Sequence, residues 1–378
     1  MQLHRLAACF LFLLLASCTR PPAVVADTSA PDPLPAEVQP SRIDLSPYPP
    51  SPVIERMTIA PTRQSIGHGD NWAITWGDDD KQYAYMIDGR GFGMVFASEL
   101  SMAPVLIEGS PPDIKGYHIG SSSGTVPGPE LGALSRKVSG LVMINGTLYA
   151  WVRNLNPEGA PIGTGASLIY SEDHGTNWTW VDWSWPHTGY PVWMNAGRDY
   201  AAAQDGYAYF ISPDGPSAYA DYPNLLMGRV DTAAILDSTA YEYYGGNTDN
   251  GTARWGPYAD RRPVFTDPSG CFRPNLVYNP GLDRYLLLMS TPYGDWQWWR
   301  NDNPDRLAHF AVFDAPNPWG PWTTVEYIPD FGKPENRFSP NIPPKWISED
   351  GTEFYLQYSV IPNGPYRLNL QPVTLQLR

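Results

Sequence analysis

The sequence has few cysteines, three among 378 residues. Cys9 and Cys18 lie in the first eighteen residues, so Cys271 is the only one in the remainder of the chain. A single cysteine cannot form an internal disulfide, even in an oxidising compartment. The six histidines are scattered and lack the paired spacing of a zinc site, and we predict neither a metal nor a cofactor.

Clusters of positive charge and long apolar runs are missing as well. The chain has 25 Lys and Arg against 39 Asp and Glu, a formal net charge of −14. Without a basic patch to neutralise phosphates, nucleic acid is a poor candidate partner. After the N-terminal region no segment has eighteen consecutive apolar residues, and no amphipathic stretch of helical length stands out. These absences disfavour nucleic-acid binding and helical folds.

The first eighteen residues predict export. They place His4 and Arg5 before an apolar run that is too short to span a membrane as a mature helix, which is typical of a signal peptide. The ending Leu15–Cys18 resembles a bacterial lipobox, in which cleavage precedes the cysteine and lipid is attached to it. We expect a lipoprotein anchored through Cys18 at the bacterial cell envelope, periplasmic or at the surface; an ordinary secreted protein is the alternative. Residues 19–58, rich in Pro, Ala and Ser, predict a disordered tether.

A near-regular series of turns runs through the rest of the chain. Each turn precedes a tyrosine by a few residues, and the tyrosines recur at intervals of roughly sixty to eighty residues, as in repeat architectures. They are Tyr83, Tyr149, Tyr207, Tyr285 and Tyr355. Units of this length fit four-stranded blades with long loops, and closing five of them into a ring protects the sheet edges. We predict one all-β domain, a five-bladed β-propeller over residues 59–378, with a two-sheet sandwich as the alternative.

The octet at residues 171–178, SEDHGTNW, resembles the Asp-box of sialidase-type propellers, with Asn177 in place of the threonine. The resemblance implies that Asp173 closes a hairpin turn and that Trp178 packs between blades. We therefore do not place Asp173 among the catalytic candidates.

The stretch from residue 69 to 93 supplies the candidate acid pair. Asp70 and Asp88 lie at the outer ends of two predicted antiparallel strands, and a hairpin returns to the side from which it started. Both carboxylates should therefore share one edge of one sheet. Hydrolysis of a glycosidic bond needs such a pair, one acid to protonate the leaving oxygen and one base to activate water. The alternative is that both aspartates only form turns.

Further side chains are candidates for binding a substrate, each with a structural alternative. The strand that ends at Arg153 should aim this residue at the axis, to bind a sugar hydroxyl or keep a carboxylate ionised, or else to form a structural ion pair. The loop carboxylate Glu335 would be a third acid or simply solvated, and Trp346 would line a subsite or wedge between blades. The complete set is Trp72, Arg153, Asn154, Arg273, Asn275, Glu335, Lys345 and Trp346.

Several phrases together resemble one family. They are Asp70-Asn71-Trp72 with Asp88-Gly89, and residues 139–154, 198–212, 240–246 followed by Trp255, 271–287, 315–323 and 343–351. This set, from about Arg63 to the C-terminus, resembles the domain-of-unknown-function family 4185, five-bladed propellers related to bacterial endo-D-arabinanases. The resemblance implies an inverting glycoside hydrolase whose acid pair is Asp70 and Asp88. The chain departs from shorter arabinanases around Asp88, where it reads IDGRG instead of a Gly-Asp-Thr pattern.

We therefore expect an exported, endo-acting glycoside hydrolase that cleaves a polysaccharide such as an arabinan, with Asp70 as base and Asp88 as acid, or the reverse. One alternative is a non-catalytic carbohydrate-binding propeller. Another is a polysaccharide lyase, which needs Tyr with His, or Lys with Arg, beside a uronate; its histidine candidates are His68, His118 and His187. A closed ring with polar outer turns predicts a monomer.

Overall fold

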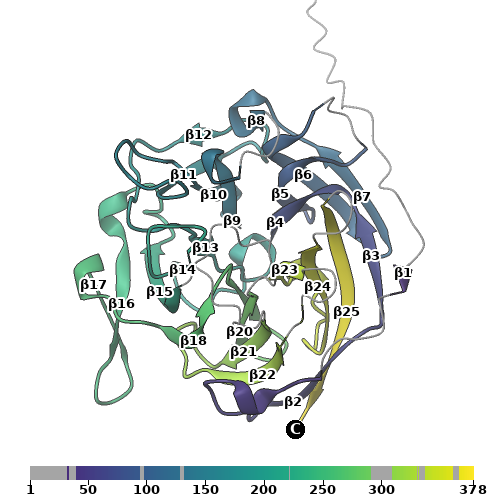
Figure 1. Ribbon diagram of the computed structural model, residues 1–378, viewed down its shortest axis with the longest axis vertical. Coiled ribbons are helices and arrows are strands. Elements are labelled where there is room, and N and C mark those ends of the chain that lie inside the picture. The colour runs from purple at the N-terminus through teal and green to yellow at the C-terminus, as the bar shows by residue number, and fades with distance from the viewer. Residues whose placement is uncertain are drawn as a thin grey trace, which may run out of the picture.

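The chain folds into a ring of five β-sheets around a central axis (Figure 1). The computed structural model describes residues 32–33, 40–93, 98–127, 132–220, 222–290, 309–329, 331, 337–360 and 366–378. These residues contain strands and short 3-10 helices but no α-helix, and none of their helices is long and apolar enough to span a membrane. The predicted all-β, five-bladed propeller is confirmed.

Each blade is an antiparallel sheet whose first strand lies closest to the axis. Blade 1 consists of β4 (His68–Trp76), β5 (Gln82–Gly91), β6 (Leu100–Ser110), β7 (Asp113–His118) and β8 (Val126–Pro127). Blade 2 consists of β9 (Lys137–Ile144), β10 (Thr147–Arg153), β11 (Ala166–Ser171) and β12 (Thr179–Trp180). Blade 3 consists of β13 (Val192–Trp193), β14 (Tyr207–Pro213), β15 (Tyr222–Asp231), β16 (Glu242–Asn247), β17 (Ala253–Gly256) and β18 (Phe265–Cys271).

The last two blades follow the same plan. Blade 4 consists of β19 (Asn275–Asn279), β20 (Arg284–Ser290), β21 (His309–Ala315) and β22 (Thr323–Pro329). Blade 5 consists of β23 (Arg337–Asn341), β24 (Glu353–Val360) and β25 (Arg367–Leu377), joined by β3 (Thr62–Ile66), β2 (Ile54–Ile59) and β1 (Asp32–Pro33). Strands from both ends of the chain thus share blade 5, because β2 and β3 both pair with β25. This pairing closes the ring and covers a sheet edge that would otherwise be open.

Ordered structure begins before the predicted boundary at residue 59. The Tyr48 ring stacks on Phe265 with centroids 4.7 Å apart, and the Ser51 amide donates to the Thr324 carbonyl at 2.8 Å. The strand β2 (Ile54–Ile59) also begins before residue 59. The prediction of a disordered tether as far as residue 58 is therefore wrong for residues 40–58. The sequence of this segment resembles that of a disordered tether because it is rich in proline and has little periodicity. In the structure it runs extended along blades 4 and 5.

The recurring turns connect the first and second strands of each blade. All five tyrosines of the predicted rhythm lie in a second strand, namely β5, β10, β14, β20 and β24. These turns lie at one face of the ring, which we call the turn face. The opposite face, where the five innermost strands begin, is called the mouth face.

Aromatic side chains fill the spaces between blades. The Trp151 ring lies 5.2 Å from Trp193 and 4.7 Å from Trp185, joining blades 2 and 3. In the Asp-box, Asp173 Oδ1 accepts a hydrogen bond from the Asn177 backbone amide at 2.8 Å, which closes the turn between β11 and β12. The buried Trp178 ring packs on Tyr85 of blade 1, 5.0 Å away. Both structural roles implied by the Asp-box resemblance are confirmed.

Candidate functional site

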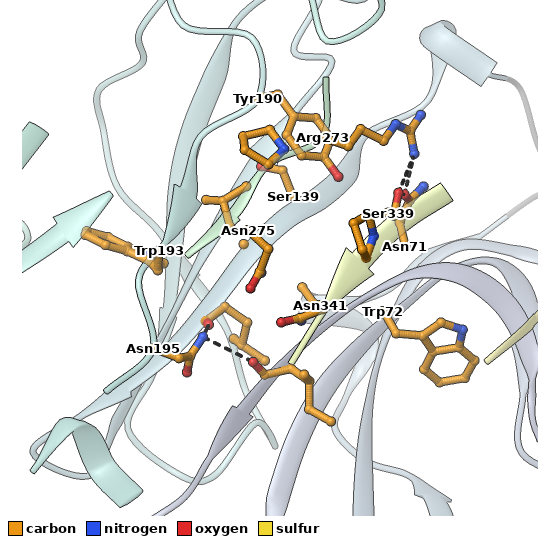
Figure 2. Close-up of a pocket in the computed structure, with 17 residues that line it drawn as sticks. Asn71, Trp72, Ser139, Tyr190, Trp193, Asn195, Arg273, Asn275, Ser339 and Asn341 are labelled. Carbon is orange, nitrogen blue, oxygen red and sulfur yellow. Dashed lines mark hydrogen bonds between the residues drawn. The ribbon is translucent and has the colours of Figure 1, made fainter. Parts of the chain in front are cut away.

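A cavity opens on the axis at the mouth face (Figure 2). It encloses about 370 Å³, part of which is open to solvent, and every blade contributes residues from its innermost strand or next to it. The lining comprises residues 71–74 of blade 1, 139–141 of blade 2, Tyr190, Val192, Trp193 and Asn195 of blade 3, 273–275 of blade 4 and 339–341 of blade 5. The ring closure therefore brings five distant segments of the chain to one site.

Asp70 and Asp88 lie side by side at the mouth end of blade 1. Asp70 opposes Ile87 in the β4–β5 ladder, so the Cα atoms of the two aspartates are no more than about 9 Å apart. The expectation that they share one sheet edge is confirmed. Both side chains are buried, 3% and 4% exposed, and neither belongs to the cavity wall. Asn71, which does line the cavity, donates from Nδ2 to Asp70 Oδ1 at 3.0 Å.

Asp88 lies among positive charges contributed by other blades. Lys137, the first residue of β9, donates from Nζ to Asp88 Oδ1, and its side chain is 1% exposed. Burial raises the pKa of the Asp88 carboxyl above its ordinary value. The surrounding cations act in the opposite direction, Lys137 most strongly and then Arg153 and Arg273. A buried carboxyl with a raised pKa can hold a proton and donate it to a leaving group.

Arg153 reaches the site from the end of β10, as its strand position predicted. Its Nη1 donates to the Tyr219 hydroxyl at 2.8 Å and to Asn154 Oδ1 at 3.3 Å. Asn154 in turn donates from Nδ2 to the Ser135 carbonyl at 2.8 Å and to the Tyr219 hydroxyl at 3.0 Å. The guanidinium is thus fixed in position by neighbours in loops of blades 2 and 3.

Arg273 connects three blades across the mouth. Its Nη1 donates to Asn71 Oδ1 and, at 3.4 Å, to Ser339 Oγ, and Ser339 also donates to Asn71 (Figure 2). Asn275, two residues further along at the start of β19, lines the cavity. The structure therefore brings together Asp70, Asp88, Arg153, Asn154, Arg273 and Asn275 of the residues predicted from the sequence.

Part of the backbone at this mouth is strained. Five residues that are not glycine adopt left-handed φ angles there: Asn71 (45°), Asp88 (48°), Asn154 (61°), Arg273 (47°) and Ser339 (53°). Asn and Asp tolerate this conformation, but it is uncommon for Arg and Ser. Strain of this kind costs about 1–3 kcal/mol per residue and is typical of functional sites.

Three predicted site residues have side chains committed elsewhere, although Trp72 is one of the residues that line the cavity. The Trp72 ring points away from the other labelled side chains (Figure 2), packs on Phe92 and donates to the Gly69 carbonyl at 2.8 Å. Lys345 contacts Asp80 in the β4–β5 turn, at the turn face, with Nζ 3.0 Å from Oδ1. Its neighbour Trp346 is buried between blades 5 and 1. Lys345 and Trp346 do not line the cavity, so predicting them as contacts of a substrate bound there was wrong; for Trp72, which does line it, the substrate contact stays a prediction.

Two further predictions fall on residues outside the described part of the chain, Glu335 and the lipidation site Cys18. Conversely, sequence reasoning missed Lys137, Asn71, Ser339, Tyr190 and Tyr219. Lys137 could have been found because it is a single lysine at the start of an otherwise apolar strand. Asn71 could have been found because it follows Asp70 directly. The two tyrosines and Ser339 stand in loops or at strand starts, where the sequence offers no such signal.

One group of described residues has donor atoms close enough to share a metal ion: Asp78, Asp79 and His174. It lies at the turn face, where His174 Nε2 and Asp78 Oδ1 are 2.7 Å apart. This group is at the other end of the ring from the cavity and takes no part in the site.

Comparison with solved structures finds proteins with a similar fold. A "putative hydrolase" from Bacteroides ovatus aligns with a TM-score of 0.50 and 13% identity over 83% of this chain and 93% of that chain. The likeness is one of fold. Lower scores are found for an α-L-arabinofuranosidase from Podospora anserina in complex with cellotriose (TM-score 0.45, 11% identity, 82% and 91% covered). A GH43_1 enzyme from Xanthomonas citri complexed with xylotriose gives 0.44, with 12% identity and 82% and 90% covered. Neither a protein-family model nor a curated protein matches the sequence.

Proposed function

We propose that the protein is a glycoside hydrolase that cleaves a polysaccharide by acid–base chemistry with Asp70 and Asp88. The observation that supports this best is the position of the pair. Two buried carboxyls lie on neighbouring strand ends at the mouth of the axial cavity, and burial raises the pKa of Asp88. Paired carboxyls, one protonated and one ionised, are the groups that glycosidic hydrolysis requires.

In the proposed reaction Asp88 is the general acid and protonates the glycosidic oxygen. Asp70 is the general base and removes a proton from the attacking water, while Asn71 orients its carboxylate through the Nδ2–Oδ1 hydrogen bond. We propose inversion, which needs roughly 6.5–9.5 Å between the carboxyls so that water fits, against about 5–5.5 Å for retention. Asn275, on the cavity wall, would bind the sugar next to the bond that breaks.

Product analysis by mass spectrometry on arabinans, galactans and other glycans tests this proposal. Wild type should release oligosaccharides, and Asp70→Asn and Asp88→Asn should each lose activity by roughly 10²–10⁴-fold. Asp173→Asn, in the structural Asp-box turn, is the matched control and should keep its turnover. If both site variants retain full activity, the assignment is wrong. Glycan binding without cleavage by wild type would instead support the non-catalytic propeller.

A polysaccharide lyase is the second candidate, because Tyr190 lies beside the guanidiniums of both Arg153 and Arg273. A lyase uses such cations to neutralise a uronate and a base to remove the proton next to it. Its products carry a double bond and have not gained a water molecule. The same mass spectra therefore separate elimination from hydrolysis.

Membership of the family 4185, an arabinan-like substrate, endo action and a monomeric state belong to the same proposal. So does export followed by lipid anchoring through Cys18. Metabolic labelling with a radioactive fatty acid in a bacterial host tests the anchor. We expect label in the wild type and none in Cys18→Ala, whereas equal labelling of both would exclude Cys18 as the lipidated residue.

A further inference from the structure

Two buried arginines from different blades face the same aromatic ring. The guanidinium carbon of Arg153 lies 5.3 Å from the centre of the Tyr190 ring, and that of Arg273 lies 5.6 Å from it. Tyr190 and Arg273 both line the cavity. Blades 2 and 4 thus each direct a positive charge toward the part of the cavity that blade 3 borders.

Neither guanidinium has all its donors satisfied. The recorded hydrogen bonds of both residues leave from Nη1, while the buried Nε of Arg153 and the buried Nε of Arg273 have no partner. Within the described residues neither arginine forms a salt bridge. Both residues are buried, 1% and 4% exposed.

Among the described residues of the site, the three buried cations Lys137, Arg153 and Arg273 outnumber the two buried carboxyls, Asp70 and Asp88. Asp88 is the acidic group whose charge acts on both arginines, but it is already paired with Lys137. Burying a cation without a counter-ion is costly, and proteins rarely keep such a charge without a use for it. The chain as a whole carries −14, so this positive site stands out against an acidic protein.

We infer that the glycan bound in this cavity is acidic, with a sugar carboxylate held by Arg153 and Arg273. The Nε edge of a guanidinium offers parallel donors that match the two oxygens of a carboxylate, and in both residues this edge is the one left without a partner. The inference rests on the proposed hydrolase and changes the substrate class of the same cavity from a neutral arabinan-like glycan to an acidic one. Uronic acid residues carry this group.

Titration calorimetry with matched glycans tests the inference on the wild type. The probes are four acidic polysaccharides with different backbones: polygalacturonate, polymannuronate, a glucuronan and a glucuronoxylan, each with its carboxyl-reduced neutral form. We expect at least one acidic polymer to bind, with a loss of affinity of about tenfold or more on reduction, because hydrogen bonds to a charged group are lost. Binding to none of the four, or equal affinity for reduced forms, overturns the inference. Equal affinity for a sulfated galactan overturns the carboxylate assignment.

Variants locate the contact. Arg273→Gln should lose the preference for the acidic form, and Arg273→Lys, which keeps the charge but not the paired donors, should recover only part of it. The control is Arg254→Gln, an exposed arginine on β17 at the outer side of blade 3, which should bind as wild type. An unchanged preference in a folded Arg273→Gln protein contradicts the inference. If Arg273→Gln does not fold by circular dichroism, Arg273→Lys and the wild-type glycan pairs decide.

The outcome is separable from that of the proposed hydrolase. Binding of an acidic glycan with no cleavage product would leave this inference in place and remove the hydrolase. Cleavage of neutral glycans, without preference for carboxylated ones and abolished by Asp70→Asn, would remove this inference and leave the hydrolase.

Discussion

The ammonium group of Lys137 donates a hydrogen bond to Oδ1 of Asp88, although the two residues belong to different blades and both side chains are buried. Lys137 is the first residue of β9, and Asp88 lies near the end of β5. The pair therefore joins blades 1 and 2 where the axial cavity opens. It also links the protonation of Asp88 to the position of a single cation.

Replacing Lys137 should change the pH dependence of catalysis. The lysine lowers the pKa of Asp88 against the raising effect of burial, so Lys137→Met should raise this pKa further. A general acid works only while protonated, and its activity is lost as pH rises through its pKa. The alkaline limb of the kcat/KM profile should therefore move to higher pH in Lys137→Met. Lys345→Met, at the turn face, is the control and should leave the limb in place. A limb that stays or moves to lower pH in Lys137→Met would show that Asp88 is not the acid.

The same pair makes a prediction about stability. Removing one partner of a buried ion pair leaves the other uncompensated and costs about 3–5 kcal/mol, whereas replacing both by uncharged residues is often close to neutral. In urea unfolding, Asp88→Asn should therefore be destabilised, and Asp88→Asn with Lys137→Met should regain much of the loss. Additive losses in the double variant would mean that the two side chains do not depend on each other.

The Asp-box gives the opposite pattern, a loss of stability without a loss of chemistry. Asp173 accepts hydrogen bonds from the amide of Asn177 and from the hydroxyl of Ser171, 2.9 Å away, in an exposed turn. Asp173→Ala should lower the free energy of unfolding by roughly 0.5–1.5 kcal/mol for each hydrogen bond lost, since water can replace the carboxylate in this exposed turn. Its kcat and KM should match the wild type. A drop in kcat with an unchanged unfolding midpoint would indicate that this loop communicates with the cavity.

The sequence was informative where local chemistry repeats. Turn residues followed by tyrosine mark the first hairpin of every blade, because each blade needs a turn and a packed aromatic side chain at the same position. Asp70 and Asp88 could be predicted as neighbours because a hairpin brings its ends together within a few residues of chain. Arg153 could be placed for a related reason, since its position at the end of a strand is set by alternation along that strand.

The contacts that cross blades could not be predicted. Lys137 meets Asp88 only because the ring closes, and the bond between Arg273 and Asn71 spans about two hundred residues of sequence. The role of the tryptophans could not be predicted from the sequence either. A binding platform and a wedge between blades have the same composition, and only the ring geometry shows that Trp346 is a wedge.

Trp346 and Asn275 should separate packing from binding. Trp346 is buried between blades 5 and 1, so Trp346→Ala should cost about 3–5 kcal/mol of stability and leave KM unchanged below the melting temperature. Asn275 lines the cavity, so Asn275→Ala should raise KM and leave the melting temperature nearly unchanged. Thermal unfolding and steady-state kinetics on both variants test this. The reverse pattern would restore Trp346 as a substrate contact.

Ring closure predicts how far the N-terminus can be shortened. Residues 40–60 contribute β2, which pairs with β25, and Tyr48, whose ring packs on Phe265 and, 5.7 Å away, on Phe313. A chain that starts at residue 61 exposes the apolar surface that these residues cover and leaves one edge of β25 unpaired along this stretch. Burying a single aromatic side chain is worth about 1.5–3 kcal/mol, so we expect a clear fall in the melting temperature, or failure to fold. A chain that starts at residue 31 is the control and should have the same melting temperature as the longer protein. Equal melting temperatures for both truncations would mean that the segment before residue 61 adds no stability. The closure of the ring in blade 5 would then depend on the pairing of β3 with β25 alone.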